Sequence, residues 1–512
     1  MTGDFFQVVS SKRLAAFANL FFSLGTLGFN IVSGLLMVPI YLRYMDSATY
    51  GAWLASYGII SLIGLCESGL SSVTTQRLAM AISRGDKKEF ACLLGTSTIM
   101  SFLLSGVAIL FGAVLVVYLP DWVGTPPEQM KVMRFALMLS VFGSAAIIIM
   151  HQFGAVSQAW QRTTFPGIVN LAALCAYVGV IIGLLYRGYG LVSLGAGQLV
   201  NGVFMAIGQF VVVVAQWWRL GFPTPCYSRA TAGDLWRESR ALLVARIAGA
   251  VGSNLEVPLA AMVASPAAST VLALTGKVMT LVMMMTERIG SAVFAGLAYI
   301  SGKPSTQRDQ VIGEIVNIST VLSGIGLAFA LVFSKPIITL WVGPELFGGN
   351  WLVILIMVSC LMSIRMRLYS NFAMALGEIR RVAGWMIAEA MMRLALLVGL
   401  GLLLRVFGLP LANAIVSAII MTILGQLLIH RLRVRSPVVW LPGWPSLTIA
   451  MSVALTWMLL IPVARTWTEL TWQAGIFAAL VLLLSVAVDS QWRAALRKNY
   501  YTLPWRLVRR SS

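Results

Sequence analysis

Residues 50–90, YGAWLASYGIISLIGLCESGLSSVTTQRLAMAISRGDKKEF, hold the pattern that decides the fold. A nearly unbroken apolar run is followed, at 84–88, by a polar turn that carries three basic residues. A helix of about 20 apolar residues crosses the hydrocarbon core of a bilayer, and Lys and Arg gather at the cytoplasmic ends of such spans. The stretch therefore predicts a membrane-spanning helix at 48–75 that ends at the cytoplasmic surface. One acid, Glu67, lies inside it.

The composition extends this interpretation to the whole chain. Of 512 residues, 59% are hydrophobic and only 11% are charged, whereas soluble domains carry about 25% charged residues. Apolar runs between residues 15 and 488 predict about fourteen transmembrane helices. The first run, 14–42, is too long for the core of a signal peptide, so we expect an uncleaved first span. The chain is predicted to be an all-α integral membrane protein.

The basic residues are distributed asymmetrically along the chain. The net charge is +19, which on a soluble protein would suggest binding to nucleic acid. Here most Lys and Arg residues outside the predicted spans fall on one side, which becomes the cytoplasmic side if the N-terminus is cytoplasmic. An even number of spans then leaves both termini in the cytoplasm. The charge is explained by topology, and no nucleic-acid partner is expected.

An internal repeat predicts the domain organisation. Trp122-Val123-Gly124 recurs at a constant offset as Trp341-Val342-Gly343, each time in an outer loop after the third helix of a half. Six helices per half give two bundles of the same orientation, related by an axis along the membrane normal. The predicted parts are an N-terminal bundle at 1–218, a cytoplasmic linker at 219–240, a C-terminal bundle at 241–436, and two further helices with a basic tail at 437–512.

The cysteines and histidines indicate no metal site and no cofactor. The five Cys and two His have no metal-ligand spacing. Four cysteines lie in apolar segments, where a thiol is most often a small packing residue. These are Cys66, Cys92, Cys175 and Cys360.

Several cations fall inside predicted helices. An ionisable group at membrane depth costs roughly 2.5–3.5 kcal/mol on insertion scales, so it usually faces a cavity or a partner. Lys277, Arg246, Arg288 and Arg365 are the candidates for binding an anionic cargo, because Arg and Lys donors match phosphate well. The alternative for each is that its side chain extends to the membrane interface.

Embedded acids form a second set. Glu256, with Asn254 two residues before it, is a candidate for the cavity. Glu389 and Arg393 are four residues apart and can pair along one helix, or they can take part in transport. Glu67 has two interpretations: it satisfies backbone groups or an Arg at a local helix irregularity, or it responds to a proton or cation at an inner gate.

The first predicted helix carries a polar stripe. Asn19, Ser23, Thr26 and Asn30 are spaced by three or four residues, so they share one face. The stripe is either a helix-packing surface of small polar residues or one wall of a hydrated cavity.

Residues 50–90 resemble the start of bacterial polysaccharide flippases, the O-antigen and exopolysaccharide translocases of the multidrug/oligosaccharidyl-lipid/polysaccharide exporter (MOP) superfamily. The resemblance rests on Tyr50-Gly51-x-Trp53, on the acid-x-Gly-Leu unit that begins at Glu67, and on Arg77-Leu78-Ala79. The outer-loop sequence LWVGPELFGG at 340–349 is also similar to that family. Many members carry Asp where this chain has Glu67.

The resemblance implies two six-helix bundles in a V around a central cavity that opens alternately to each side. It implies a non-enzymatic transporter of the bacterial inner membrane, whose cargo is an undecaprenyl-pyrophosphate-linked oligosaccharide. Lys277, with Arg246 or Arg288, is then expected to bind the pyrophosphate. A proton gradient, a sodium gradient or the membrane potential would drive the transport. Other partners would be membrane lipids and other polysaccharide-assembly proteins. The alternatives are a flippase of the peptidoglycan lipid precursor, an ion-coupled multidrug extruder, and a membrane-embedded enzyme of glycan assembly, which would need a long outer loop.

Overall fold

The computed structural model describes residues 12–160, 164–221, 223–286, 305–440 and 442–488. All regular secondary structure in these ranges is helical, as predicted. Within these ranges, eleven helical stretches are long and apolar enough to cross a membrane, or up to twelve if a bent pair counts as one span. This agrees roughly with the predicted number of about fourteen, because 381–430 counts as one stretch and the charged helix α8 is not among the eleven. The chain is a multi-pass membrane protein.

Contacts between residues divide the chain into two compact units. Unit 1 comprises Met1–Thr270 and Met386–Val406, and unit 2 comprises Val271–Trp385 and Phe407–Ser512. The predicted domain boundaries follow the sequence repeat instead and remain a prediction. The division by contacts assigns residues 241–270 to unit 1 because they pack on its helices.

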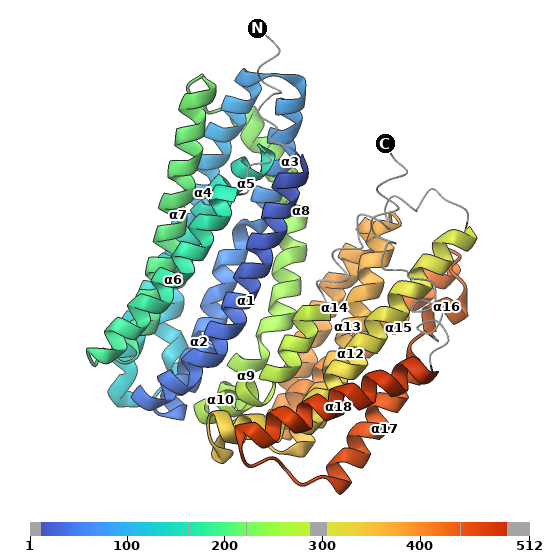
Figure 1. Ribbon diagram of the computed structural model, residues 1–512. Helices are drawn as coiled ribbons and strands as arrows, with labels where there is room; N and C mark the ends of the chain where they lie inside the picture. Colours follow the sequence, from blue (N-terminus) through green and yellow to red (C-terminus); the bar gives the residue numbers. More distant parts are fainter. Residues whose placement is uncertain (1–11, 161–163, 222, 287–304, 441, 489–512) are drawn as a thin grey trace. The chain divides into compact units, whose positions relative to one another are not determined.

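Unit 1 is a bundle of long helices in which α5 lies along α7 (Figure 1). The α4 and α3 helices pack on α5, and α6 packs on α7 and α1. Its elements are α1 (Lys12–Tyr44), α2 (Ser47–Ser61), η1 (Leu62–Glu67), α3 (Ser68–Arg84), α4 (Lys87–Trp122), η2 (Pro127–Gln129), α5 (Met130–Ala159), α6 (Thr164–Tyr186), α7 (Val192–Leu220), α8 (Arg229–Asn254) and α9 (Glu256–Val263). The α10 helix (Pro266–Thr275) runs into unit 2.

Aromatic contacts mark the two ends of unit 1. At one end, the rings of Tyr44 and Tyr186, the last residues of α1 and α6, lie 6.2 Å apart. At the other end, Phe90 in the first turn of α4 stacks on Trp160, 5.7 Å away, and lies 6.0 Å from Trp217. Trp160 caps α5 and Trp217 lies near the end of α7. Successive long helices therefore alternate in direction, as the predicted topology requires.

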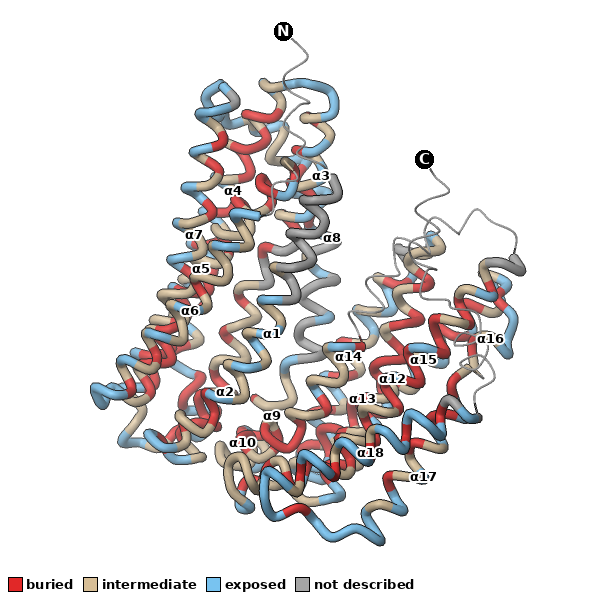
Figure 2. The backbone as a smooth tube through the Cα atoms, in the orientation of Figure 1, coloured by how far each residue is buried: buried red, intermediate tan, exposed pale blue. Residues whose placement is uncertain are grey.

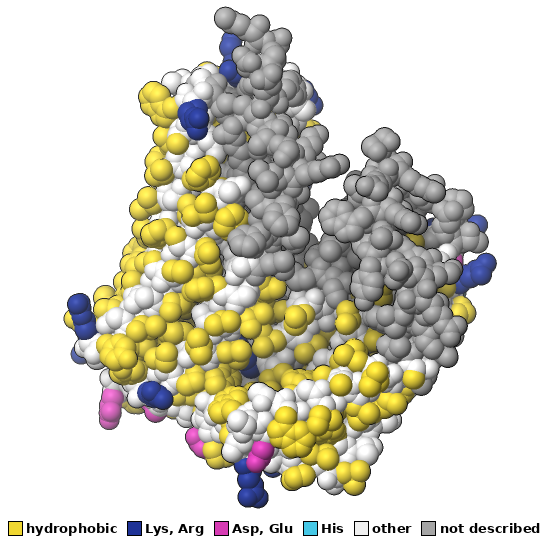
Figure 3. All heavy atoms as spheres, in the orientation of Figure 1, with side chains coloured by type: hydrophobic (Ala, Val, Ile, Leu, Met, Phe, Trp, Pro, Cys, Tyr) yellow, Lys and Arg dark blue, Asp and Glu magenta, His cyan; other side chains and the backbone are white. Residues whose placement is uncertain are grey.

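The surface of these helices is as apolar as their interior. Leu78, Phe90 and Leu235 are buried in a core that α3, α4, α5, α7 and α8 share (Figure 2). On the outward face of α4, however, Leu103 is 66% exposed and Leu110 is 71% exposed. Hydrophobic side chains cover much of the face shown in Figure 3. Soluble monomers rarely expose such extended apolar surface, and a lipid bilayer covers it at no cost.

In unit 2, α13 packs along α15, and α12 packs against α17 and α18, the two helices that follow the repeat. Phe333 of α12 meets Phe477 of α18 with ring centroids 5.5 Å apart, and Trp457 of α17 completes the cluster. The elements are α12 (Ser305–Trp341), η3 (Pro344–Leu346), α13 (Asn350–Ala375), α15 (Gly408–His430), α16 (Ser436–Trp440), α17 (Trp444–Leu460) and α18 (Trp467–Val488). The helix α14 (Ile379–Leu404) and the following η4 (Arg405–Phe407) run across the unit boundaries.

The sequence repeat has a local structural counterpart. The long helices α4 and α12 end at Trp122 and Trp341. Each is followed by a turn through a glycine with positive φ, 75° at Gly124 and 108° at Gly343, which favours glycine because a side chain would be strained. A short 3₁₀ helix and another long helix, α5 or α13, come next. At this point the two halves have the same order of elements.

Candidate functional site

The predicted site residues are divided between the two units. Unit 1 contains the α1 stripe, Glu67, Asn254, Glu256, and the Glu389–Arg393 pair, whereas unit 2 contains Lys277 and Arg365. Arg288 lies outside the described residues. Asn19 and Ser23 lie on α1 and Arg246 lies on α8. Each unit is described in turn.

Glu67 lies at a break in the second membrane span. The helix that was predicted over 48–75 consists of α2, the 3₁₀ segment η1 and α3, and Glu67 is the last residue of η1. A 3₁₀ stretch inside a long helix often marks a hinge or a strained sequence. The predicted helix irregularity is therefore confirmed. Glu67 forms no side-chain capping hydrogen bond to α3, and both interpretations of its carboxylate stay predictions.

The Glu67 carboxylate is enclosed. The residue has no exposed surface, and it forms no ion pair among the described residues; its polar neighbour is Ser71 of α3. The η1 segment packs against α5 and α8, and a Cβ on Gly64 would lie 4.0 Å from the Ser144 carbonyl oxygen. A buried carboxylate without a charged partner is costly when ionised. Glu67 therefore requires a bound proton or a cation to remain in this position at low cost.

The predicted ion pair between Glu389 and Arg393 forms on α14. Arg393 Nη2 lies 2.6 Å from Glu389 Oε1, one turn away. The side chains are 7% and 18% exposed, respectively, so water screens the pair poorly. Burial of both partners together leaves neither charge uncompensated. This geometry supports the interpretation of a neutralised internal pair.

Asn254 and Glu256 flank a second break. The predicted span at 241–263 consists of α8, which ends at Asn254, and α9, which begins at Glu256. A carboxylate in the first turn of a helix is favoured by the exposed N–H groups there. Gly58 of α2 faces this region, since a Cβ on it would lie 3.4 Å from Pro258 Cγ. Both Asn254 and Glu256 make polar contacts of their own.

One residue of the polar stripe on α1, Thr26, contacts a neighbouring helix. Thr26 Oγ1 accepts a hydrogen bond of 3.2 Å from Asn170 Nδ2 on α6. Asn30, one turn further along α1, is exposed. Thr26 thus joins two helices, whereas Asn30 has a surface position compatible with a hydrated wall. Helix contact is observed at Thr26, and the hydrated wall stays a prediction.

Lys277 lies at a bend in unit 2. It begins the helix 277–286, which is bent by 49° from α10 at Gly276. Lys277 is half-buried and takes part in no ion pair among the described residues. Substrate sites in transporters are often formed where a transmembrane helix is discontinuous. An unneutralised cation at such a break is suited to bind an anionic group.

Arg365 is held by the segment that leads into α17. It is 3% exposed, and its Nη2 donates a 3.1 Å hydrogen bond to the Pro442 carbonyl oxygen. Its guanidinium lies over the Trp444 ring, 5.2 Å from the centroid. Tyr369, one turn along α13, donates to the Val439 carbonyl oxygen at 2.5 Å. Arg365 thus anchors the appended helices of unit 2, and its Nε has no partner among the described residues.

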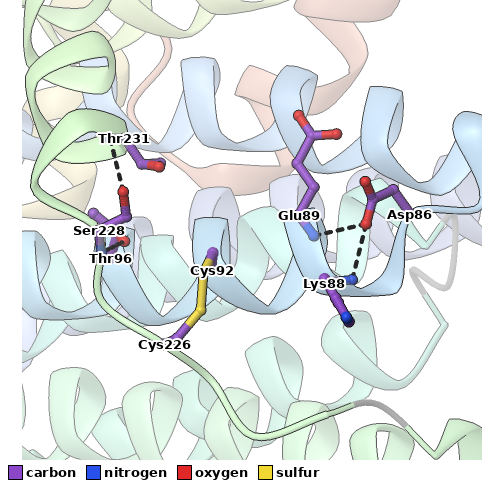
Figure 4. Close-up of a disulfide and its surroundings, with 8 residues drawn as sticks. All are labelled: Asp86, Lys88, Glu89, Cys92, Thr96, Cys226, Ser228 and Thr231. Carbon is purple, nitrogen blue, oxygen red and sulfur yellow. Dashed lines mark hydrogen bonds between the residues drawn. A yellow bond between two sulfur atoms is a disulfide. The ribbon is translucent and has the colours of Figure 1, made fainter.

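A disulfide that the sequence did not suggest joins Cys92 of α4 to Cys226 of the linker (Figure 4). The expectation that Cys92 is only a packing residue was wrong. The Cys226 backbone lies so close to α4 that a Cβ on Gly95 would be 2.5 Å from its carbonyl oxygen. Cys226 lies in the polar linker, outside the apolar segments, and that position was the one signal of a different role.

The chain that follows this disulfide is also bound to unit 1. The Ser228 backbone N–H donates a 3.0 Å hydrogen bond to Thr96 Oγ1, and the Ser228 hydroxyl accepts one from the Thr231 backbone N–H at the start of α8. Further along α8, Glu238 forms an ion pair with Arg77 of α3. The start of α8 is therefore tied to α3 and α4.

Comparison with known proteins identifies the fold. No family model and no curated protein matches the chain. Among solved structures, the lipid II flippase MurJ in an inward closed conformation is similar, with a TM-score of 0.72, 12% identity, and coverage of 91% of this chain and 98% of that one.

Two transporters of the MOP superfamily are also similar. A multidrug resistance MATE family transporter in an inward-facing conformation has a TM-score of 0.63 at 14% identity, over 84% of this chain and 95% of that chain. A transporter from Pyrococcus furiosus has a TM-score of 0.56 at 14% identity, over 86% and 99%. These neighbours are transporters and flippases rather than enzymes. The chain has the fold of the transporters of the MOP superfamily.

Proposed function

We propose that this protein is a flippase for a polyprenyl-pyrophosphate-linked oligosaccharide, an O-antigen or exopolysaccharide repeat unit. It moves the head group from the cytoplasmic to the periplasmic leaflet of the bacterial inner membrane by alternating access. Sugars and pyrophosphate cannot cross hydrocarbon unaided, while the polyprenyl chain remains in lipid. The protein's task is to supply a polar route for the head group.

The observation that carries this proposal is Lys277. It is a cation at a helix break with no ion pair among the described residues, within a fold similar to that of a lipid II flippase. An ammonium group there attracts a pyrophosphate and leaves it free to depart, because no rigid bidentate pair forms. Arg246 and Arg288 are proposed as additional phosphate ligands. Arg365, which is bonded to Pro442, contributes to the positive field from within unit 2.

Glu67 is proposed as the coupling group. Its carboxylate is buried at the η1–α3 break and has no charged partner among the described residues. Exchange of a proton or cation at this position changes the charge inside unit 1 and gives a driving gradient a site of action. Glu256 and the Glu389–Arg393 pair are alternative coupling sites.

The proposed orientation places the Phe90–Trp160–Trp217 end of unit 1 in the cytoplasm. Arg77, Arg84, Lys87, Lys88, Arg219, Arg229, Arg237 and Arg240 all belong to helix ends or to α8 on that side. Fewer basic residues lie at the opposite end, including Arg43 and Arg187. The positive-inside rule then gives cytoplasmic termini. At the proposed outer end of unit 1, the connection 187–191 is short.

Reconstitution tests the proposal. Proteoliposomes are loaded with a polyprenyl-pyrophosphate-linked oligosaccharide, and transfer between leaflets is scored by an enzyme or lectin that acts on one side. Lys277→Glu is expected to abolish transfer and Lys277→Arg to retain part of it, with both proteins folded. Lys335→Glu, an exposed lysine of α12, is the control and should leave transfer intact. Full transfer by Lys277→Glu would contradict the proposal.

A second candidate is a flippase of the peptidoglycan lipid precursor, favoured by the similarity to the lipid II flippase. The same vesicles distinguish the two, because unlabelled lipid II and unlabelled oligosaccharide lipid compete with the labelled cargo to different extents. A multidrug extruder, favoured by the MATE neighbours, would instead move organic cations against a proton or sodium gradient and ignore both lipids.

A further inference from the structure

An apolar groove runs along unit 1 between α4 and α8, with α3 as its floor. Its volume is about 200 Å³. The lining includes Leu70 of α3, Leu103, Leu104 and Val107 of α4, and Trp236 and Ser239 of α8. Leu103 and Val107 are more than 60% exposed, so the groove opens sideways, away from the bundle interior.

The depth of the groove follows from the contacts at its lower end. Ser228, just before α8, is hydrogen-bonded to Thr96 of α4, which begins earlier, at Lys87. From this level the two helices run onward together. At 1.5 Å per residue, Trp236 lies roughly 12 Å above that level and Val107 roughly 16 Å. The groove therefore occupies the half of the membrane next to the basic end of unit 1. Tryptophan is typical of the boundary between head groups and hydrocarbon.

One cation beside the groove is uncommitted. Arg240 is one turn after Trp236 on α8, is exposed, and forms no ion pair among the described residues. By contrast, Arg237 pairs with Asp234 at 2.8 Å and Arg77 pairs with Glu238. Arg240 is thus available to an anion at the edge of the groove.

The groove also contains an unsatisfied hydroxyl. Ser239 is 3% exposed, lines the groove, and its Oγ has no hydrogen-bond partner among the described residues. A buried hydroxyl without a partner costs about 1–3 kcal/mol. A ligand that brings an acceptor to the groove wall beside Arg240 would remove this cost.

We propose that the groove binds one acyl chain of an anionic diacyl phospholipid from the adjacent leaflet. The phosphate lies at Arg240, a glycerol ester carbonyl accepts from the Ser239 hydroxyl, and the chain lies along Leu104 and Val107. An ester is the feature that selects this occupant, because a polyprenyl phosphate has a phosphate and a hydrocarbon chain but no carbonyl near its head group. The bound lipid holds α8 against α3 and α4. The proposal is independent of the cargo.

Native mass spectrometry of the detergent-solubilised full chain tests it, with phosphatidylglycerol, phosphatidylcholine and undecaprenyl phosphate as probes. Wild-type protein should retain phosphatidylglycerol best. Arg240→Gln should lower that retention about fivefold, as expected for one Arg near an anionic head group. Arg229→Gln, an exposed arginine three turns earlier on α8, is its control and should change retention little.

Two further variants separate the groove from general lipid adhesion. Leu103→Trp fills the groove and should remove bound phospholipid, whereas Leu110→Trp, equally exposed two turns on, should not. Ser239→Ala should lower the retention of phosphatidylglycerol and leave the retention of undecaprenyl phosphate unchanged. Equal retention of phosphatidylglycerol by wild type and Arg240→Gln, or preference for phosphatidylcholine or undecaprenyl phosphate, would overturn the proposal. Thermal unfolding confirms that each variant is folded.

Discussion

Arg77 of α3 and Glu238 of α8 form a two-point ion pair, in which Arg77 Nε donates to Glu238 Oε2 at 3.1 Å and Nη2 donates to the other carboxylate oxygen. The residues are 161 positions apart. Together with the disulfide, this pair fixes the start of α8 to the preceding helices. The linker therefore has a defined path along unit 1.

The pair predicts a pH-dependent contribution to stability. The hydrogen bond from Arg77 lowers the pKa of Glu238 below its usual value. A depressed carboxyl pKa contributes stability that is fully present above the pKa of the unfolded chain and is lost as the pH falls through the folded-state pKa. Because the pair is partly exposed, its contribution is at most about 1 kcal/mol.

We therefore expect Glu238→Gln to lower the melting temperature slightly at neutral pH and to match wild type under acidic conditions. Scanning fluorimetry across pH measures both. Asp234→Asn serves as a control, since Asp234 pairs only within α8. A difference between wild type and Glu238→Gln that grows on acidification would contradict the prediction.

Loss of the Cys92–Cys226 disulfide should destabilise the protein. It closes a loop across a sequence separation of 134, and disulfides typically contribute about 2–4 kcal/mol. Without reductant, Cys226→Ser should unfold at a lower temperature than wild type. Reductant should lower the unfolding temperature of wild type but not that of Cys226→Ser. Equal sensitivity of wild type and variant to reductant would show that the bond is not formed.

The same disulfide reports the orientation of the protein. Cys226 is exposed in the linker, so after reduction a membrane-impermeant maleimide labels it from one side only. In a Cys175→Ser background, which removes an exposed free thiol, labelling is expected in inside-out vesicles. Labelling of intact spheroplasts would reverse the proposed topology.

Arg365 should be required for the stability of unit 2. Its hydrogen bond to Pro442 and its contact with Trp444 are lost in Arg365→Ala, at an expected cost of about 2–4 kcal/mol. Arg365→Lys should recover only part of the lost stability, because an ammonium cannot stack on the indole as a guanidinium does. Protein yield and thermal unfolding measure this. A well-folded Arg365→Ala protein that fails only in transport would instead place Arg365 in the substrate route.

Glu67→Gln separates a structural role from a coupling role. The carboxylate forms no ion pair among the described residues, and the amide oxygen of Gln can still accept from its neighbour Ser71, so we expect an unchanged protein level and a stability change below about 1 kcal/mol. The dependence of transport on pH or on the ion gradient should disappear, because an amide neither titrates nor neutralises a cation. Glu67→Asp is the conservative control and should keep that dependence. A severe loss of folded Glu67→Gln protein would indicate that the residue is structural.

Local patterns in the chain were sufficient for several features. The length and hydropathy of apolar runs predicted the helices, since a span must satisfy its own backbone hydrogen bonds. The spacing of Glu389 and Arg393 predicted their ion pair because four residues make one helical turn. The Glu-Ser-Gly sequence at Glu67 predicted the irregular second span, and the repeated Trp-Val-Gly predicted equivalent turns.

Only the tertiary structure decided which distant groups meet. Cys92 meets Cys226, Arg77 meets Glu238, and Arg365 meets Pro442 across separations of 134, 161 and 77 residues. Hydropathy carries no information about such pairs, because many helix arrangements bury the same apolar faces. The enclosed position of Glu67 and the half-buried position of Lys277 likewise depend on which neighbours pack beside each break. This difference underlies the different roles proposed for the two charges.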